Sequence, residues 1–361
     1  MRAEIEDIPA VVERVLRDGA AEQTTAAEAI RARSPRWVSV VGRGTSDHAA
    51  LYARYLLEGL LGLPVMLAAP SLTTLYGGGQ RWADALVLAV SQSGAGPDVL
   101  EVTTAARASG ATTVAVTNDP RSPLAAAAEF VLDVRAGPER SVAATKSYVG
   151  ELAAIAALSG RLARRDVAAR LQAALEDVPG AVRAVIAECE PRLGEVARIV
   201  SDGRGALVVA RGIELPTALE IALKLKETSA IFADGYSGAD LLHGPIVLAG
   251  PDVPAVVVRQ AGAVGAALDV VVDRLRAEGS PVVRIVDAEA GAAGQAAPAV
   301  PAGAAGDGAV TVDLVQPAVV DELVGPLVHV VPGQLVAEAV ARLRGRDPDA
   351  PEGLTKVTKT R

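Results

Sequence analysis

Two clusters of hydroxyl side chains stand directly after apolar runs, in positions suited to hold an anion. Ser91-Gln92-Ser93-Gly94 follow the apolar run 85–90, and Thr45-Ser46 follow a run that ends in Arg43-Gly44. Each run is typical of a buried strand and each cluster precedes a helical pattern, so hydroxyls and free N–H groups would converge at a helix start. Ligands of open α/β sheets gather at the carboxyl ends of strands, which favours one shared phosphate site. Ordinary helix caps are the alternative, and the local sequence leaves both open.

A second pair of reactive side chains, Lys224 and Glu227, lies one turn apart on a segment of helical pattern. Such spacing places both side chains on one face of a helix. A lysine beside a carboxylate lowers the carboxylate pKa and so keeps a candidate base ionised. An exposed Glu/Lys pair of an ordinary surface helix is the alternative.

The elements that must position these residues alternate between short apolar runs and longer helical patterns. Runs at 38–42, 64–69, 85–90, 112–118 and 129–134 are separated by patterns that predict helices near 47–61 and 98–108. Continuous apolar runs between helices are typical of parallel strands covered on both faces. The first half is therefore predicted to be an α/β domain.

The second half repeats this pattern after a long helical stretch from about 143 to 201. The runs VSVVGRG and ALVVARG both end in Arg-Gly before a helix, which indicates structural repeats. Runs at 253–259, 281–287, 309–315 and 326–332 continue the alternation, with helices predicted near 263–278 and 334–344. We expect a helical segment over 1–34, domains over 35–165 and 166–345, and a tail over 346–361. An Ala, Gly and Pro-rich stretch over 287–307 is predicted to be a mobile surface loop.

Bulk composition narrows the class of protein. A chain of 361 residues suits two domains, and its net charge of -8 argues against nucleic-acid binding. The single cysteine forms no internal disulfide or thiolate metal site, and the first residues carry no apolar signal core. Apolar stretches fall short of the roughly 20 residues that a membrane helix needs. These features favour a cytoplasmic protein without nucleic-acid or membrane partners.

Five segments occur in an order that makes a family resemblance specific. They are GRGTS, SQSGAGPDVLE, VAATKSY, ALEIALKLKETSAIFADGYSGADLLHGP and EGLTKVT. From about residue 35 onward the chain resembles the tandem sugar isomerase (SIS) family, in the arrangement of the isomerase half of glucosamine-6-phosphate synthase. The resemblance implies two tandem, doubly wound, mainly parallel-sheet α/β domains with a flavodoxin-like three-layer fold.

The resemblance also implies which residues bind substrate. The first domain would hold the 6-phosphate of a sugar, and Thr45 and Val142 would line the pocket. The phosphate-binding residues would be Ser46, Ser91, Gln92 and Ser93, beside the loop residues Arg43 and Gly44.

The catalytic residues implied by the resemblance are Glu227, Lys224, His243 and Lys356. Glu227 would move a proton between C1 and C2, with Lys224 beside it, and Lys356 would reach the substrate carbonyl and form a Schiff base. His243 would assist ring opening from the neighbouring subunit, which implies a homodimer. These groups supply a base, a cation and a ring-opening acid/base, so no metal or organic cofactor is expected. His48 and His329 are predicted to be capping or packing residues.

The chain departs from the family pattern around the substrate. No glutaminase is expected, because the first predicted strand begins by residue 38. Ala95, Gly96 and Ala144 replace polar residues, and Arg43 stands in place of a small thiol side chain. These changes predict altered substrate choice, and we favour an isomerase and deaminase of a 6-phosphorylated amino sugar. A dehydratase of N-acetylglucosamine 6-phosphate, a deglycase and a non-catalytic sugar-phosphate sensor are the alternatives.

Overall fold

The protein's computed structural model describes residues 1–78, 80–288, 310–316 and 320–356. The chain forms two compact units, each with one sheet. The first-sheet unit comprises Asp7–Arg140, Ala144–Pro179 and Thr355–Arg361. The second-sheet unit comprises Met1–Glu6, Ser141–Ala143 and Gly180–Leu354.

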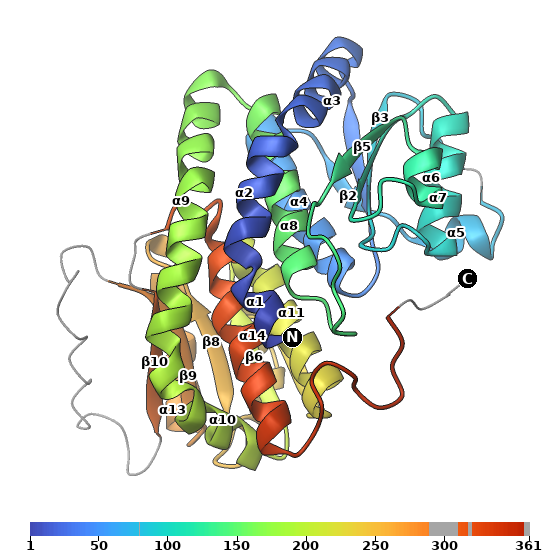
Figure 1. The fold of residues 1–361 in the computed structure, drawn as a ribbon. Coiled ribbons are helices and arrows are strands. Elements are labelled where there is room, and N and C mark those ends of the chain that lie inside the picture. The colour runs from blue at the N-terminus through green and yellow to red at the C-terminus, as the bar shows by residue number, and fades with distance from the viewer. Residues whose placement is uncertain (79, 289–309, 317–319, 357–361) are drawn as a thin grey trace. The chain divides into compact units, whose positions relative to one another are not determined.

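The first-sheet unit is a three-layer α/β/α structure (Figure 1). Its elements are α2 (Ile8–Asp18), α3 (Ala20–Arg33), β1 (Trp37–Val41), α4 (Thr45–Leu61), β2 (Val65–Leu67), α5 (Pro70–Thr74), β3 (Ala85–Val90), α6 (Pro97–Ala108), β4 (Thr112–Thr117), α7 (Pro123–Ala127), β5 (Phe130–Asp133) and α8 (Lys146–Leu162). The strands lie in the order β2-β1-β3-β4-β5, and all pairs are parallel. Helices α4 and α8 lie on one side of the sheet, and α5, α6 and α7 lie on the other.

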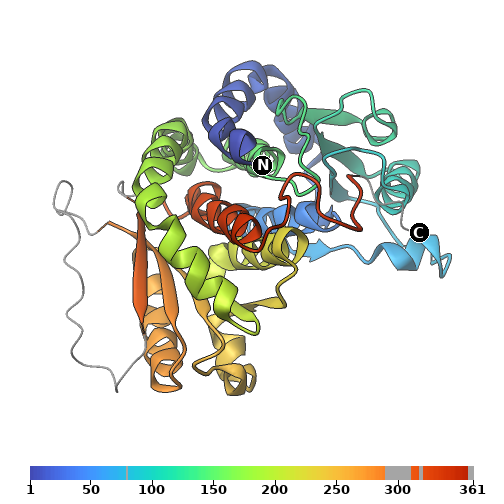
Figure 2. The same cartoon turned by 60° about the horizontal axis from the view of Figure 1, so that its bottom comes forward.

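The second-sheet unit has the same architecture. Its elements are α1 (Arg2–Glu6), α10 (Leu193–Asp202), β6 (Ala206–Ala210), α11 (Leu215–Ser229), β7 (Ala233–Ser237), α12 (Gly238–Leu242), β8 (Ala255–Arg259), α13 (Ala263–Ala277), β9 (Val282–Asp287), β10 (Thr311–Gln316) and α14 (Gly325–Leu343), with short 3-10 turns at Glu190–Arg192, Gly212–Glu214 and Pro245–Leu248. The parallel order is β10-β9-β8-β6-β7. Helix α14 packs beside α11 (Figure 2). Helix α9 (Arg165–Cys189) has Pro179 within it and contributes residues to both units.

The predicted fold class is confirmed. Read from the N-terminal end of each half, both sheets have the order 2-1-3-4-5 that characterises flavodoxin-like doubly wound sheets. The strands are buried because helices cover both faces, and this explains why they read as continuous apolar runs.

One predicted run has a different structure from the one its pattern suggested. Residues 326–332 form the first half of α14 rather than a further strand. Nearly every side chain of α14 is buried, so the helix shows no polar face that would reveal its 3.6-residue period. The predicted mobile loop 287–307 falls from residue 289 onward outside the described residues.

Two further properties of the described chain bear on its chemistry. None of its described helices has the length and apolar content to cross a membrane. The single cysteine, Cys189, is buried at the end of α9. Burial, together with the charges of Glu188 and Glu190, raises the pKa of the Cys189 thiol to about 12, so this thiol stays protonated and unreactive at neutral pH.

Candidate active site

The loop after β1 carries the first cluster of predicted site residues. Gly44 adopts a positive φ of 56°, and Thr45 begins α4. The buried Ser46 hydroxyl donates a hydrogen bond of 2.9 Å to Oε1 of Glu151 on α8. Arg43 is exposed, and its Nε donates to Oδ2 of the buried Asp98 at 2.5 Å. Since Asp98 lies in the first turn of α6, this ion pair holds the Arg43 guanidinium against the neighbouring loop.

The loop after β3 carries the second cluster. The Ser91 hydroxyl accepts a hydrogen bond from the backbone N–H of Gly94 at 3.2 Å, and the Ser93 hydroxyl accepts one from Ala95 at 3.3 Å. Gly94 has a φ of 58°, and a Cβ there would lie 2.1 Å from Oγ of Ser122. The position therefore requires glycine. Ser91, Gln92 and Ser93 are each half-buried.

These two loops meet at one edge of the first sheet. Strands β1 and β3 are adjacent and parallel, so their carboxyl ends share an edge, and the Arg43–Asp98 pair joins the two loops there. Hydroxyls, backbone N–H groups and a guanidinium at this edge form a set of donors suited to a phosphate.

Lys356 lies with the first-sheet unit, where it contacts a carboxylate that the sequence analysis did not single out. Its Nζ donates to Oε2 of Glu139 at 2.8 Å. The buried Glu139 also accepts from the Ser147 hydroxyl at 2.7 Å and from the backbone N–H of Thr145 at 3.0 Å. Burial acts to raise the pKa of Glu139, but the Lys356 ammonium and these hydrogen bonds outweigh it and hold that pKa below its usual value. Glu139 therefore stays ionised at the start of α8.

The second-sheet unit holds the Lys224–Glu227 pair on α11. Nζ of Lys224 lies 2.5 Å from Oε2 of Glu227 and 3.3 Å from Oε1 of Glu220. Lys224 and Glu220 are fully buried, whereas 27% of the Glu227 side chain is exposed. Burial acts to lower the pKa of Lys224, but the two carboxylates raise it above its ordinary value. The result is a charged, immobile ammonium that leaves one carboxylate, Glu227, open to a ligand.

The spacing of α11 explains this arrangement. Residues 220, 224 and 227 recur at intervals of four and three, so one helix face carries all three charged groups. Pro216 lies in the first turn, where a missing N–H costs little, and Ala230 ends the helix in the left-handed region with a φ of 49°.

His243 and Val142 both cluster with the second-sheet unit. His243 follows α12 and is exposed, and within the described residues its imidazole makes no hydrogen bond or ion pair. The structure therefore does not join it to Glu227 within one copy. Val142 donates its backbone N–H to the carbonyl oxygen of Asp349 at 3.0 Å, so it contacts the segment that leads to the C-terminal tail.

A third charged cluster occupies the carboxyl edge of the second sheet. Nδ1 of His329 lies 2.7 Å from Oε1 of Glu214, and Nε2 lies 2.8 Å from Oδ1 of Asp287. Burial acts to lower the pKa of His329, but the two carboxylates raise it to about 10. His329 is thus a buried imidazolium. The sequence predicted a capping or packing residue at His329 and did not predict its positive charge, because Glu214 and Asp287 are far from His329 in sequence.

The described residues contain no cluster of three or more His, Cys, Asp or Glu side chains suited to a metal ion. The charged groups at the candidate site are carboxylates and ammonium groups, and the loops at the edge of the first sheet add hydroxyls and a guanidinium. A partly exposed carboxylate beside a buried ammonium is suited to abstract a proton from carbon.

Comparisons with known proteins show which family the chain resembles. The SIS domain model matches residues 33–159 and 200–308. The glutamine–fructose-6-phosphate aminotransferase (isomerizing) of Thermococcus kodakarensis is 35% identical over 325 residues, which cover 88% of this chain and 51% of that protein. The chain thus spans about half the length of the curated relatives it matches.

Solved structures agree with the sequence matches. A candidate phosphosugar isomerase from Silicibacter pomeroyi superimposes with a TM-score of 0.81 at 35% identity, covering 97% of this chain and 99% of that one. The C-terminal domain of glucosamine-fructose-6-phosphate aminotransferase from Francisella tularensis gives a TM-score of 0.81 at 25% identity, with 96% of each chain covered.

Proposed function

We propose that this chain, which belongs to the SIS (sugar isomerase) family of phosphosugar isomerases, isomerises and deaminates a 6-phosphorylated amino sugar such as glucosamine 6-phosphate. The observation that carries the proposal is the α11 pair, in which the partly exposed Glu227 carboxylate lies 2.5 Å from the buried Lys224 ammonium. An enzyme that moves a proton between adjacent sugar carbons needs an ionised base held in a fixed position.

The proposed reaction uses few protein groups. After ring opening, Glu227 removes the C2 proton of the open-chain amino sugar and returns it to C1. The C1 oxygen gains a proton and the amine loses one, so that C1 becomes a CH2OH group and C2 becomes a C=N imine. Water then hydrolyses this imine to release ammonia and leave a ketose phosphate. Lys224 holds the Glu227 carboxylate in position before the transfer, through an ion pair of 2.5 Å.

Phosphate binding is assigned to the first-sheet unit. The predicted residues Ser46, Ser91, Gln92 and Ser93 stand at one sheet edge, with Arg43 held there by Asp98. Hydrogen bonds to a phosphate are charge-assisted and therefore stronger than neutral ones. Arg43 supplies positive charge at an edge where the loop residues 95 and 96 are Ala and Gly. We propose that this charge compensates for the polar side chains that the family pattern has at these two positions and this chain lacks.

Lys356 is proposed to act on the substrate carbonyl. Glu139 holds the Lys356 Nζ in place in the absence of ligand, since the two groups are 2.8 Å apart. A substrate that reaches Lys356 must exchange this contact for its own carbonyl, and a Schiff base requires that the ammonium first lose a proton.

A homodimer is proposed because His243 has no partner among the described residues of its own unit. Exposed apolar side chains surround it on α12 and on the following turn, namely Leu242, Val247 and Leu248. A second copy that covers these residues would bury apolar surface and bring His243 to another active site. The domain division at 35–165 and 166–345, with a tail over 346–361, is part of the same proposal.

One assay distinguishes the proposed reaction from its rivals. Purified protein is incubated with glucosamine 6-phosphate and, separately, with N-acetylglucosamine 6-phosphate, while free ammonia and ultraviolet absorbance are followed. Ammonia together with fructose 6-phosphate, lost in Glu227→Gln, would support the deaminase. Absorbance without ammonia would indicate the dehydratase instead. Silence with both substrates would exclude the amino-sugar assignment and favour a deglycase or a sensor.

A complementation experiment tests the dimer. Glu227→Gln and His243→Ala are each expected to be inactive alone, but their mixed dimers would contain one site with both native residues. Recovery of up to about a quarter of wild-type activity in an equal mixture is expected from random pairing of the subunits. No recovery, with dimers present by sedimentation, would place His243 in the site of its own subunit.

A further inference from the structure

Two adjacent cavities lie in the first-sheet unit, on the helices α2, α3, α8 and α9. Their volumes are ≈ 310 Å³ and ≈ 230 Å³, and both are lined by Gly160, Arg161 and Ala168. The larger is bordered by α3 and the smaller by α2, with α8 and α9 common to both. Together they offer the space that a small organic ligand needs.

The larger cavity is lined by three arginines, Arg31, Arg161 and Arg165. The side chains of Arg31 and Arg165 make no hydrogen bond or ion pair with any residue that the structure describes. Arg161 donates only to neutral oxygens, the Thr24 hydroxyl at 3.2 Å and the carbonyl oxygen of Ala157 at 3.1 Å. Three arginines thus line one cavity, and none of their side chains pairs with a carboxylate among the described residues, which favours an anionic ligand.

Arg161 stands where the two cavities join and is the least exposed of the three. Its burial lowers the pKa of its guanidinium, because a charged group loses hydration there without gaining an opposite charge. An anion bound beside Arg161 would supply that charge.

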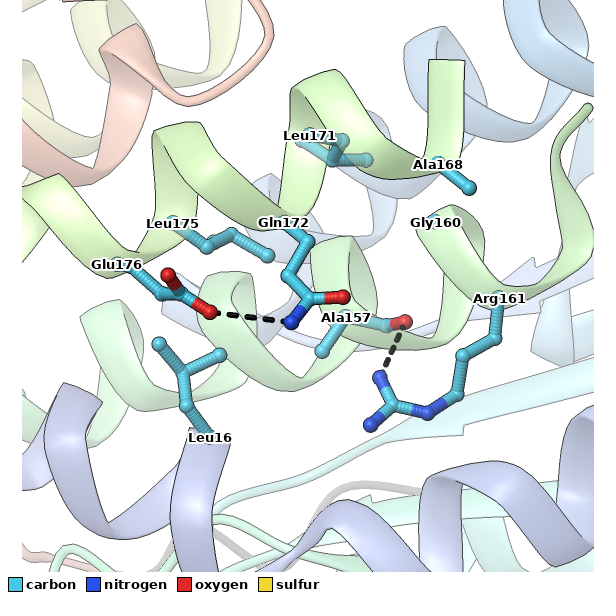
Figure 3. A pocket seen from close by; sticks show the side chains of 9 residues that line it. All are labelled: Leu16, Ala157, Gly160, Arg161, Ala168, Leu171, Gln172, Leu175 and Glu176. Atoms are coloured by element: carbon cyan, nitrogen blue, oxygen red, sulfur yellow. Dashed lines mark hydrogen bonds between the residues drawn. The ribbon is translucent and has the colours of Figure 1, made fainter. Parts of the chain in front are cut away.

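The smaller cavity has a different character (Figure 3). Leu16, Leu171 and Leu175 point into it, and the Gln172 amide donates to the Glu176 carboxylate at 3.0 Å. An anion would be repelled by Glu176, whereas an uncharged and partly apolar group would contact the leucines. The two cavities therefore select a ligand with an anionic end and an uncharged body.

We propose that these cavities form a binding site for a small phosphomonoester, with its phosphate on the three arginines and its uncharged body among the leucines. The site is distinct from the phosphate-binding edge of the first sheet. It lies at the end of α8, a helix of 17 residues whose first turn contacts Glu139.

The experiment uses phenyl phosphate and adenosine 5′-monophosphate, each compared with its dephosphorylated form, phenol or adenosine. Amide hydrogen exchange over residues 157–176 reports binding at the cavities, and exchange over residues 91–96 reports the sheet edge. Arg31→Gln combined with Arg165→Gln removes two of the three arginines without breaking a described side-chain contact. Arg36→Gln combined with Arg81→Gln is the matched control, because it also removes two positive charges, here from exposed side chains with no described side-chain partner.

We expect at least one phosphomonoester to slow exchange over 157–176 while its dephosphorylated form does not. The double variant should bind about tenfold or more weakly, since each lost guanidinium removes a charge-assisted hydrogen bond, and the control should bind as the wild type does. Protection confined to 91–96, equal protection by phenol or adenosine, or unchanged binding by the double variant would each overturn the proposal.

Discussion

The carboxyl edges of the two sheets have the same backbone design but opposite chemistry. In each, an Arg-Gly pair follows the first strand of the unit in chain order, β1 or β6, and Gly44 and Gly212 both have positive φ, at 56° and 61°. The first edge then continues with Thr45-Ser46 and the second with Ile213-Glu214. Ser46 donates to a carboxylate on α8, whereas Glu214 accepts from the imidazolium of His329 on α14.

The loops after the next strands differ in the same way. Register places Val41 opposite Ala89 in the first sheet and Val209 opposite Val257 in the second. By that register Ser91-Gln92-Ser93-Gly94 corresponds to Arg259-Gln260-Ala261-Gly262. The hydroxyls of the first loop are absent from the second. There Arg259 pairs with Asp269, and His329 pairs with the buried carboxylates of Glu214 and Asp287. One copy of a repeated edge is thus suited to an anion from outside, and the other neutralises its charges internally.

The largest expected effect is on kcat, and it tests whether proton transfer depends on Glu227 in the second-sheet unit. Glu227→Gln removes the only partly exposed carboxylate of the α11 charge cluster, and we expect kcat to fall by roughly 10²–10⁴-fold with KM nearly unchanged. Lys224 keeps Glu220 as a partner at 3.3 Å, so the fold should persist. Steady-state kinetics measure the effect, and Glu101→Gln on an exposed face of α6 is the control. A comparable loss in the control would contradict the assignment.

The next largest effect concerns the internally neutralised edge. His329→Gln leaves Glu214 and Asp287 buried without a positive partner, so the free energy of unfolding should fall by about 3–5 kcal/mol. Urea denaturation measures it. His243→Gln is the matched control, because that imidazole is exposed, and it should change stability by less than about 0.5 kcal/mol.

The same variant gives a pH test. The pKa of His329 is raised from 6.5 to about 10, so its contribution is fully present below pH 6.5 and is lost as the pH rises through 10. The stability gap between wild type and His329→Gln should therefore narrow from pH 6 to pH 10. A constant gap over this range would show that His329 is not charged in the folded protein.

A smaller effect, on KM, is expected when a carboxylate is introduced at the carboxyl edge of the first sheet and, in a separate variant, of the second sheet. Ser93→Asp sets a negative charge where the phosphate is proposed to bind, and KM should rise about 100-fold, against about tenfold for Ser93→Ala. Ala261→Asp makes the same change at the corresponding position of the second edge and should leave KM unchanged. Equal KM increases at both edges would remove the distinction between them.

The smallest effect concerns the Glu139–Lys356 contact. The pKa of Glu139 lies below its usual value, so this carboxylate stabilises the fold above about pH 4.5 and loses that contribution as the pH falls through its folded pKa. Lys356→Gln removes the ammonium, and acid unfolding should then begin at higher pH. Circular dichroism from pH 3 to pH 7 follows the shift, and an unchanged acid midpoint would mean that the contact contributes nothing in solution.

Sequence patterns predicted most strands of the two sheets, but they did not predict β7 or the first half of α14 correctly. The continuous apolar runs of β3, β4 and β6 are unmistakable because both faces are covered. Strand β7 has the sequence ADGYS, whose Asp, Gly and Ser are poor strand formers, and its pairing with β6 determines its conformation. The pattern of the first half of α14 predicts a strand because nearly every side chain there is buried, so no polar face shows the helical period.

Among the ion pairs of the candidate site, sequence spacing predicted only the one whose residues are local in sequence. Lys224 and Glu227 are three positions apart, so helix geometry alone brings them together. Glu139 contacts Lys356 across 217 residues, and Glu214 contacts His329 across 115. No spacing rule connects such positions. Glu139 lies in the loop that precedes α8, and no local sequence pattern marks it as a partner of that helix start.

Because the Cys189 thiol is buried, the wild-type chain should react little with thiol-directed labels. With a single cysteine in the sequence and a thiol pKa of about 12, maleimides and nitroxide reagents should label the unmodified protein slowly. A cysteine introduced at an exposed position of α9 or of the β3–α6 loop would then carry the only reactive sulfur. Distances and local mobility in either region become measurable without first removing a native residue.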